Sequence, residues 1–174
     1  KNILVINCTA RSNGRHGFNI VTGSRNVTII NSISFVDGYY YPTGSGCGVQ
    51  VQNNQGYPTR NVTIKNMTII DPKKAGICLN GVSNIVIGGN KNYGKTCFRI
   101  ENSVNVSIDN NTCFNANSLF TISKSNNIQI NNTLNLTDTL STYSGLKSSA
   151  VLDFTRWFLA ALFLGLSFKL FSIL

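Results

Sequence analysis

A short motif recurs along most of the chain, in which asparagine precedes alternating apolar and polar residues. In each copy Val or Ile takes every second position, as in a strand with one buried face. The copies begin at Asn2, Asn26, Asn61, Asn84, Asn105 and Asn127, and these starts are 24, 35, 23, 21 and 22 residues apart. A period of about 22 residues built from short strands predicts a solenoid.

A second strand is expected in each repeat, and its apolar residues fall in one register from copy to copy. The expected inward pairs are Phe18/Ile20, Val49/Val51, Ile77/Leu79, Phe98/Ile100 and Phe120/Ile122. The residues between them, expected to face outward, are Asn19, Gln50, Cys78, Arg99 and Thr121. We therefore predict an all-β protein, a right-handed parallel β-helix formed as a single-stranded solenoid. Other β-solenoids are the alternative.

Asparagines also recur at the turn that follows the first strand. They are Asn7, Asn31, Asn66, Asn110 and Asn132. Asparagine tolerates a left-handed backbone conformation, and its amide can bond to the same residue of the next coil. We expect both properties at these positions.

The long interval after Asn26 contains an insertion, residues 38–46, that carries Tyr39, Tyr40 and Tyr41 among glycines and a proline. Loops inserted into a solenoid commonly form its binding site. The tyrosines suit stacking on sugar rings, and Tyr40 is the residue that we assign to substrate. Packing of the tyrosines on their own coil explains them equally well.

Three segments are expected along the chain. Residues 1–135 form the β-helix, which begins inside a repeat and is expected to be incomplete at its N-terminus. Residues 136–156 form a Ser/Thr-rich linker, and the apolar run 157–174 forms a C-terminal apolar helix. That run nearly spans a hydrocarbon core. It is a transmembrane anchor, a glycolipid-anchor signal or an amphipathic helix that caps the last coil, and the three interpretations stay open.

The charge balance favours a polyanionic partner. Lys+Arg number 15 against 6 Asp+Glu, for a net charge of +9. Such a surface suits nucleic acid, an acidic membrane or an acidic polysaccharide. No Lys/Arg-rich run, zinc-ligand spacing or helix-turn-helix pattern is present, which argues against nucleic acid.

The cysteines and the Asn-x-Ser/Thr sequons indicate whether the protein is secreted. The five cysteines form no CxxC pair, so no metal site is predicted, and their odd number leaves at least one unpaired within the chain. Eight Asn-x-Ser/Thr sequons fit the glycan acceptors of a secreted protein. Asn-Val-Thr-Ile is equally how this repeat forms a turn followed by a strand.

Cations recur two residues before the second strand of successive coils, at Arg15, Lys74 and Lys95, with Gly46 interrupting the series. Coils stack about 4.8 Å apart, so a linear polyanion can lie along this column with a carboxylate near each cation. The residues expected to bind substrate are Lys74, Lys95, Arg99, Asn19, Gln50 and Tyr40.

His16 is the only histidine in the chain and follows Arg15 directly. An acidic sugar has a weakly acidic hydrogen at C5, and its removal needs a neutralised carboxylate and a base. Arg15 suits the first task and His16 the second, so both are predicted to be catalytic. Reprotonation of the enolate-like anion on the opposite face gives epimerisation, and loss of the 4-linked sugar gives β-elimination.

Residues 15–22, Arg-His-Gly-Phe-Asn-Ile-Val-Thr, resemble the Arg-His-Gly-Phe-Asn-Val-Val-Thr motif in the catalytic module of secreted bacterial mannuronan C5-epimerases. The resemblance continues more weakly to about Asn132. It implies a parallel β-helix that converts mannuronate to guluronate in alginate, with Arg15 and His16 in the active site. The family commonly depends on calcium, but no ligand can be assigned here. The family's second catalytic motif, Tyr-Gly-Phe-Asp-Pro-His, lies upstream of the first residue of this chain.

The function expected from these observations is that of a polysaccharide C5-epimerase, secreted or held at the cell surface, that acts on an alginate-like polyuronate. Two alternatives remain. One is a polyuronate lyase of the same fold, and the other is a non-catalytic surface β-helix for glycan binding or adhesion.

Overall fold

The computed structural model describes residues 2–39, 46–54 and 56–136. Tyr40, nearly all of the predicted linker and the predicted apolar helix 157–174 lie outside these residues. Within them the chain is all-β, with no helix, so none that is long and apolar enough to cross a membrane is present there.

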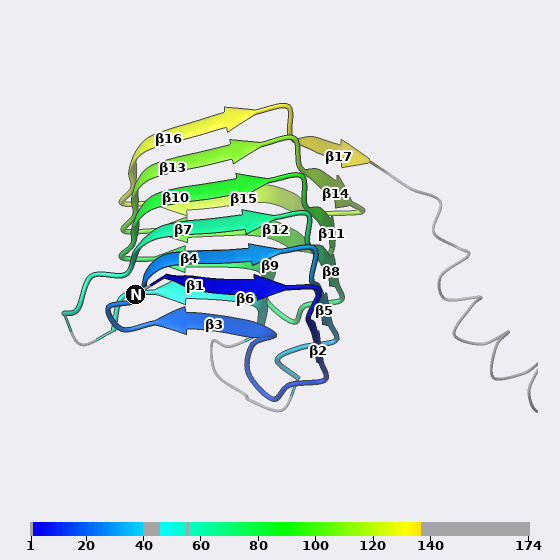
Figure 1. Ribbon diagram of the computed structural model, residues 1–174. Helices are drawn as coiled ribbons and strands as arrows, with labels where there is room; N and C mark the ends of the chain where they lie inside the picture. The colour runs from blue at the N-terminus through cyan, green and yellow to red at the C-terminus, as the bar shows by residue number, and fades with distance from the viewer. Residues whose placement is uncertain (1, 40–45, 55, 137–174) are drawn as a thin grey trace, which may run out of the picture. The chain divides into compact units, whose positions relative to one another are not determined.

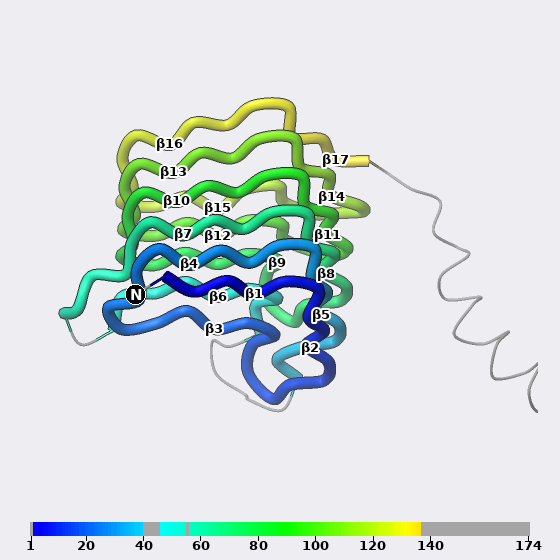
Figure 2. Tube along the Cα trace, in the orientation of Figure 1, coloured from blue at the N-terminus to red at the C-terminus, as the bar shows by residue number. Residues whose placement is uncertain are grey.

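The strands form three parallel sheets, which is consistent with a parallel β-helix (Figure 1). Sheet A contains β1 (Ile3–Ile6), β4 (Arg25–Ile30), β7 (Arg60–Lys65), β10 (Ser83–Gly88), β13 (Val104–Asp109) and β16 (Asn126–Asn131). Sheet B contains β2 (Thr9–Arg11), β5 (Ile33–Phe35), β8 (Thr68–Ile70), β11 (Lys91–Tyr93), β14 (Thr112–Phe114) and β17 (Leu134–Leu136). Sheet C contains β3 (Phe18–Val21), β6 (Cys47–Gln52), β9 (Ala75–Asn80), β12 (Thr96–Glu101) and β15 (Ser118–Ser123). Figure 2 shows successive coils lying one above the other.

The predicted registers are confirmed. In sheet A, Val27 pairs with Val62, which in turn pairs with Ile85. In sheet C the predicted inward pairs align from coil to coil: Phe18↔Val49, Val49↔Ile77, Ile77↔Phe98 and Phe98↔Phe120. Most of these residues are buried in one core. Phe18 and Phe120, on the outer strands of the sheet, are partly buried against this core, and Ile122 on the last strand, β15, is 42% exposed.

Sheet B is a finding that the sequence did not predict. Its strands have three residues each, which is too short for an alternating pattern to stand out. A coil therefore has three strands where the sequence indicated two.

Asparagines stabilise the corners of the coils. The predicted turn residues Asn7, Asn31, Asn66, Asn110 and Asn132 all have positive φ, as expected. One side-chain bond joins two of these turn residues, from Asn66 Nδ2 to Asn31 Oδ1 at 3.2 Å. The continuous hydrogen-bonded ladder lies at the asparagine that opens each repeat. It consists of the bonds Asn26→Asn2, Asn61→Asn26, Asn84→Asn61, Asn105→Asn84 and Asn127→Asn105, each from Nδ2 to Oδ1 at 2.8–3.1 Å.

Two disulfides link parts of the solenoid. Cys47 on β6 bonds to Cys78 on β9, and Cys97 on β12 bonds to Cys113 on β14 inside the core. Cys8 is free and exposed, which confirms that the odd number of cysteines leaves one unpaired.

Candidate functional site

A polar pocket of about 250 Å³ lies over sheet C. Its lining consists of Arg15, His16, Gln50, Gln52, Lys74, Cys78, Leu79, Asn80, Arg99 and Glu101. These residues come from the coils of β3, β6, β9 and β12, which are neighbours in the sheet. With parallel strands about 4.8 Å apart, the pocket extends over about 14 Å along the stack of coils.

Five of the residues predicted from the sequence line this pocket together. They are Arg15, His16, Gln50, Lys74 and Arg99. Two others do not line it, although both are exposed: Lys95 lies in the turn before β12, and Asn19 lies on β3. Tyr40 lies outside the described residues.

Asp37 anchors the turn that carries Arg15 and His16. This buried carboxylate accepts hydrogen bonds from the backbone and side-chain nitrogens of Asn13 at 2.8 and 2.9 Å, and from Ser34 Oγ at 2.6 Å. Gly17 allows the close approach, since a Cβ there would overlap Ser34 Oγ and lie 2.6 Å from Asp37 Oδ2. The glycine after the Arg-His pair is therefore required by packing.

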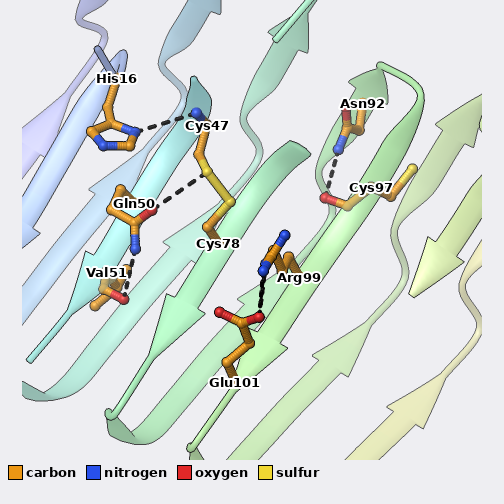
Figure 3. The surroundings of a disulfide bond; sticks show 9 residues. All are labelled: His16, Cys47, Gln50, Val51, Cys78, Asn92, Cys97, Arg99 and Glu101. Carbon is orange, nitrogen blue, oxygen red and sulfur yellow. Dashed lines mark hydrogen bonds and ion pairs between the residues drawn. A yellow bond between two sulfur atoms is a disulfide. The ribbon is translucent and has the colours of Figure 1, made fainter. Parts of the chain in front are cut away.

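The ring of His16 is held by the next coil. It is 9% exposed, and its Nδ1 accepts a hydrogen bond from the backbone N–H of Cys47 at 3.2 Å (Figure 3). A neutral imidazole whose Nδ1 is an acceptor carries its proton on Nε2. A base acting at Nε2 needs the other tautomer, whose Nδ1–H would face the Cys47 N–H. The neutral ring in this geometry is therefore a hydrogen-bond donor at Nε2.

The surroundings keep His16 neutral. Burial lowers the pKa of His16 below its ordinary 6.5, the charges of Arg15 and Lys74 lower it further, and Asp37 acts in the opposite direction. A backbone hydrogen bond to histidine often favours the charged ring, because its partner is commonly a carbonyl. Here the partner is an N–H, from which only the neutral ring can accept, so this bond also stabilises the neutral form.

The other end of the pocket contains an ion pair. Arg99 donates from Nε and Nη2 to Oε1 of Glu101 at 2.9 and 2.6 Å (Figure 3). The pKa of Lys74 is lowered by burial and by the charge of Arg99, and Glu101 partly offsets this. Among the described residues the lining thus combines three cationic side chains with one carboxylate, an electrostatic surface that favours an anion.

Two residues of the predicted outward column are buried. Gln50 is 6% exposed and Cys78 is 3% exposed, and the Cys47–Cys78 disulfide lies at this position. The side-chain oxygen of Gln50 lies 3.4 Å from Cys47 Sγ. This is a contact and not a hydrogen bond, since a disulfide sulfur carries no proton.

Sequence reasoning missed Gln52, Asn80 and Glu101, which line the pocket in a single register column. Each follows a predicted outward residue by two positions. The period-2 alternation of a strand extends the outward column to them, so this signal was available in the sequence.

Tyr39 bonds to a carboxylate that does not line the pocket. Its hydroxyl donates to Asp71 Oδ1 at 2.8 Å, and burial together with Asp71 raises the pKa of Tyr39 to about 12. A phenol with so high a pKa is a poor acid or base near neutral pH. Tyr39 is also not among the lining residues.

In the described part of the chain, no group of three or more His, Cys, Asp or Glu side chains gathers where it could hold a metal ion. Calcium also takes backbone and Asn/Gln carbonyl oxygens as ligands, so the calcium implied by the resemblance stays a prediction. No family model, no curated protein and no solved structure matches the chain. The resemblance to mannuronan C5-epimerases accordingly rests on the quoted residues alone.

Proposed function

We propose that this protein is a carbohydrate-active, right-handed parallel β-helix that takes part in C5-epimerisation of an alginate-like polyuronate, converting mannuronate to guluronate. The observation that carries the proposal is the placement of a neutral His16 beside Arg15 and Lys74 in one pocket. These groups together suit a sugar carboxylate whose negative charge increases during reaction.

The chemistry begins at the substrate carboxylate. Arg15 pairs with it, and the Nε2–H of His16 donates to one of its oxygens. Breaking the C5–H bond sends a proton to a base and moves charge onto the carboxylate oxygens, where both interactions become stronger. Return of a proton to the opposite face of C5 completes the inversion.

His16 thereby has a different role from the base predicted from the sequence. A neutral Nε2–H ring stabilises the enolate-like anion by hydrogen bonding and does not itself accept the C5 proton. Proton removal and return then belong to other groups, and the only carboxylate in the described lining, Glu101, is paired with Arg99.

The polymer is proposed to cross the strands of sheet C. Arg15, Lys74 and Arg99 belong to the first, third and fourth coils of the pocket. Coil spacing of about 4.8 Å is close to the length of a sugar unit, so consecutive carboxylates can meet consecutive coils. The two disulfides support the further proposal that the protein works in an oxidising compartment, secreted or at the cell surface.

Proton exchange at C5 tests this function. The protein, extended upstream if the gene allows, is incubated with polymannuronate in deuterated water, and proton NMR follows C5 deuteration and guluronate signals. We expect both signals, their loss in Arg15→Gln, and their retention in Arg60→Gln, which removes an exposed arginine of β7 outside the pocket.

Other outcomes point to the alternatives. New 4,5-unsaturated ends that absorb in the ultraviolet would identify a lyase. Binding of the polymer without exchange in the extended protein would contradict an enzyme and leave a glycan-binding β-helix.

A further inference from the structure

The Cys47 amide that fixes the His16 ring lies at the point where the chain returns from the insertion to sheet C. Cys47 is the first residue of β6 and directly follows the insertion 38–46. Its N–H donates to His16 Nδ1, and its C=O accepts from the N–H of Gly17 at 3.2 Å. The peptide group that carries this N–H is also held by the next coil, because the Gly46 C=O accepts from the N–H of Lys74 at 2.9 Å. The direction of the Cys47 N–H therefore depends on how β6 and β9 are placed relative to each other.

The Cys47–Cys78 disulfide fixes this placement covalently. It ties the start of β6 to the middle of β9 in the next coil, with the two Cα atoms 6.0 Å apart. Both half-cystines are buried, and Cys78 lines the same pocket as His16. Figure 3 shows the ring of His16, the Cys47 amide and the disulfide in one continuous series.

We propose that the Cys47–Cys78 disulfide is a positioning element for His16, which holds the Cys47 N–H against Nδ1 and so keeps the ring in its Nε2–H form. A cross-link between two coils thereby sets which nitrogen of the histidine carries the proton. Only the consequence for turnover rests on the proposed function, because the state of the ring can be read without substrate.

The charged groups around the ring are the same whether the Cys47–Cys78 disulfide is formed or reduced. Arg15 lies beside it on its own turn, Lys74 precedes β9, and Asp37 follows β5. Arg99 and Glu101 complete the pocket from β12. Loss of the disulfide changes none of these charges. A change in the tautomer of His16 therefore reports the position of the Cys47 amide, whereas its pKa also responds to the burial of the ring.

The second disulfide provides a matched control. Cys97–Cys113 links β12 to β14 in the core, and neither residue lines the pocket. Cys97→Ala/Cys113→Ala thus removes one disulfide from the same fold, as Cys47→Ala/Cys78→Ala does, without touching the partner of His16.

Nitrogen-15 NMR of the ring tests the proposal, and the single histidine makes the assignment unambiguous. We expect the wild-type protein to show the Nε2–H tautomer. Cys47→Ala/Cys78→Ala should show a mixture of tautomers and a His16 pKa that rises toward 6.5, while the control pair should keep the wild-type tautomer. An unchanged tautomer and pKa in Cys47→Ala/Cys78→Ala, or an Nδ1–H ring in the wild type, would overturn the proposal.

A second measurement covers the case in which that variant does not fold. The folded wild-type protein is treated with a phosphine reductant, loss of the disulfide is verified by mass spectrometry, and the same ring signals are followed. Ring signals that stay in place after reduction contradict the proposal. In the exchange assay, reduction should lower kcat with little change in KM. Absence of exchange in the wild type would count against the proposed function while the ring measurement still decides the role of the disulfide.

Discussion

At the scale of single residues, the properties of His16 depend on what packs around it. The residue sits on a turn anchored by Asp37, accepts from the Cys47 amide and has Arg15 and Lys74 nearby. Each of these partners comes from a different part of the sequence. The lone histidine was visible as a candidate, but its tautomer and charge state were not.

The lowered pKa of His16 predicts a pH dependence of stability. The unfolded chain takes up a proton near pH 6.5, whereas the folded protein resists it to lower pH. Below pH 6.5 the free energy of unfolding therefore falls by at most ~1.4 kcal/mol per pH unit until the folded pKa is passed. Urea unfolding of wild type and His16→Gln between pH 5 and 8 measures this. The stability of the wild type relative to the variant should decrease on acidification, and a constant difference would contradict the shift.

The backbone of Val36 is strained, and a substitution can relieve the strain. It has φ of 53°, in the left-handed region that costs a β-branched residue about 1–2 kcal/mol. Asparagine tolerates this conformation, so we expect Val36→Asn to raise the free energy of unfolding by about 1 kcal/mol. The control is Val86→Asn, at an exposed position of β10 without positive φ, which should lower stability because asparagine is a poor strand former. Thermal melts of the two variants should shift in opposite directions.

At the scale of elements, sheets B and C approach each other closely at one corner of each coil. Gly17, Gly48 and Gly76 precede the sheet C core residues in three successive coils, and a Cβ at any of them would meet an atom of sheet B or of the turn beside it. In the fourth coil Cys97 takes this place and bonds across to Cys113. The glycines therefore leave room for interior side chains of sheet B that lie in another part of the sequence.

This packing predicts a contrast between two glycines. A methyl group at Gly76 would overlap the carboxamide of Asn92, whose Nδ2 donates to the Cys97 carbonyl at 3.0 Å. Gly76→Ala should therefore cost about 3 kcal/mol. Gly88→Ala, whose Cβ would lie 3.5 Å from the Asp109 carbonyl oxygen, should change stability by less than about 1 kcal/mol. Equal destabilisation of the two variants in urea unfolding would show that the corner is not tightly packed.

At the scale of the whole molecule, net charge and the placement of charge have separate effects. The net charge of +9 attracts any polyanion, whereas the pocket over sheet C gathers Arg15, Lys74 and Arg99 in one place. Long-range attraction is screened by salt, and contacts inside a pocket are screened less.

Two lysines separate these contributions. Lys74→Gln and Lys124→Gln each remove one positive charge, but only Lys74 lines the pocket, whereas Lys124 is exposed beyond β15. We expect Lys74→Gln to weaken polymannuronate binding about tenfold, which corresponds to ~1.4 kcal/mol, and Lys124→Gln to weaken it less than twofold. Calorimetric titration at several salt concentrations measures this. Equal losses would mean that the polymer responds to net charge alone.

The repeat, its register and the two longer strands of each coil could be predicted from the amino-acid pattern. These follow from local rules, since alternation selects the buried face and asparagine tolerates the left-handed corner. Alternation also placed Gln50 and Arg99, and the recurring cations placed Lys74, on the side of the coils where the pocket lies.

The other features depend on contacts between coils. The short strands of sheet B carry too few residues for a pattern, and the close corner at Gly76 depends on Asn92 in another strand. The pairing of Cys47 with Cys78, the anchoring by Asp37 and the Nε2–H ring of His16 arise between residues 24 or more positions apart. Such contacts are set by how coils stack and how inserted loops rejoin them, and no local pattern encodes that geometry.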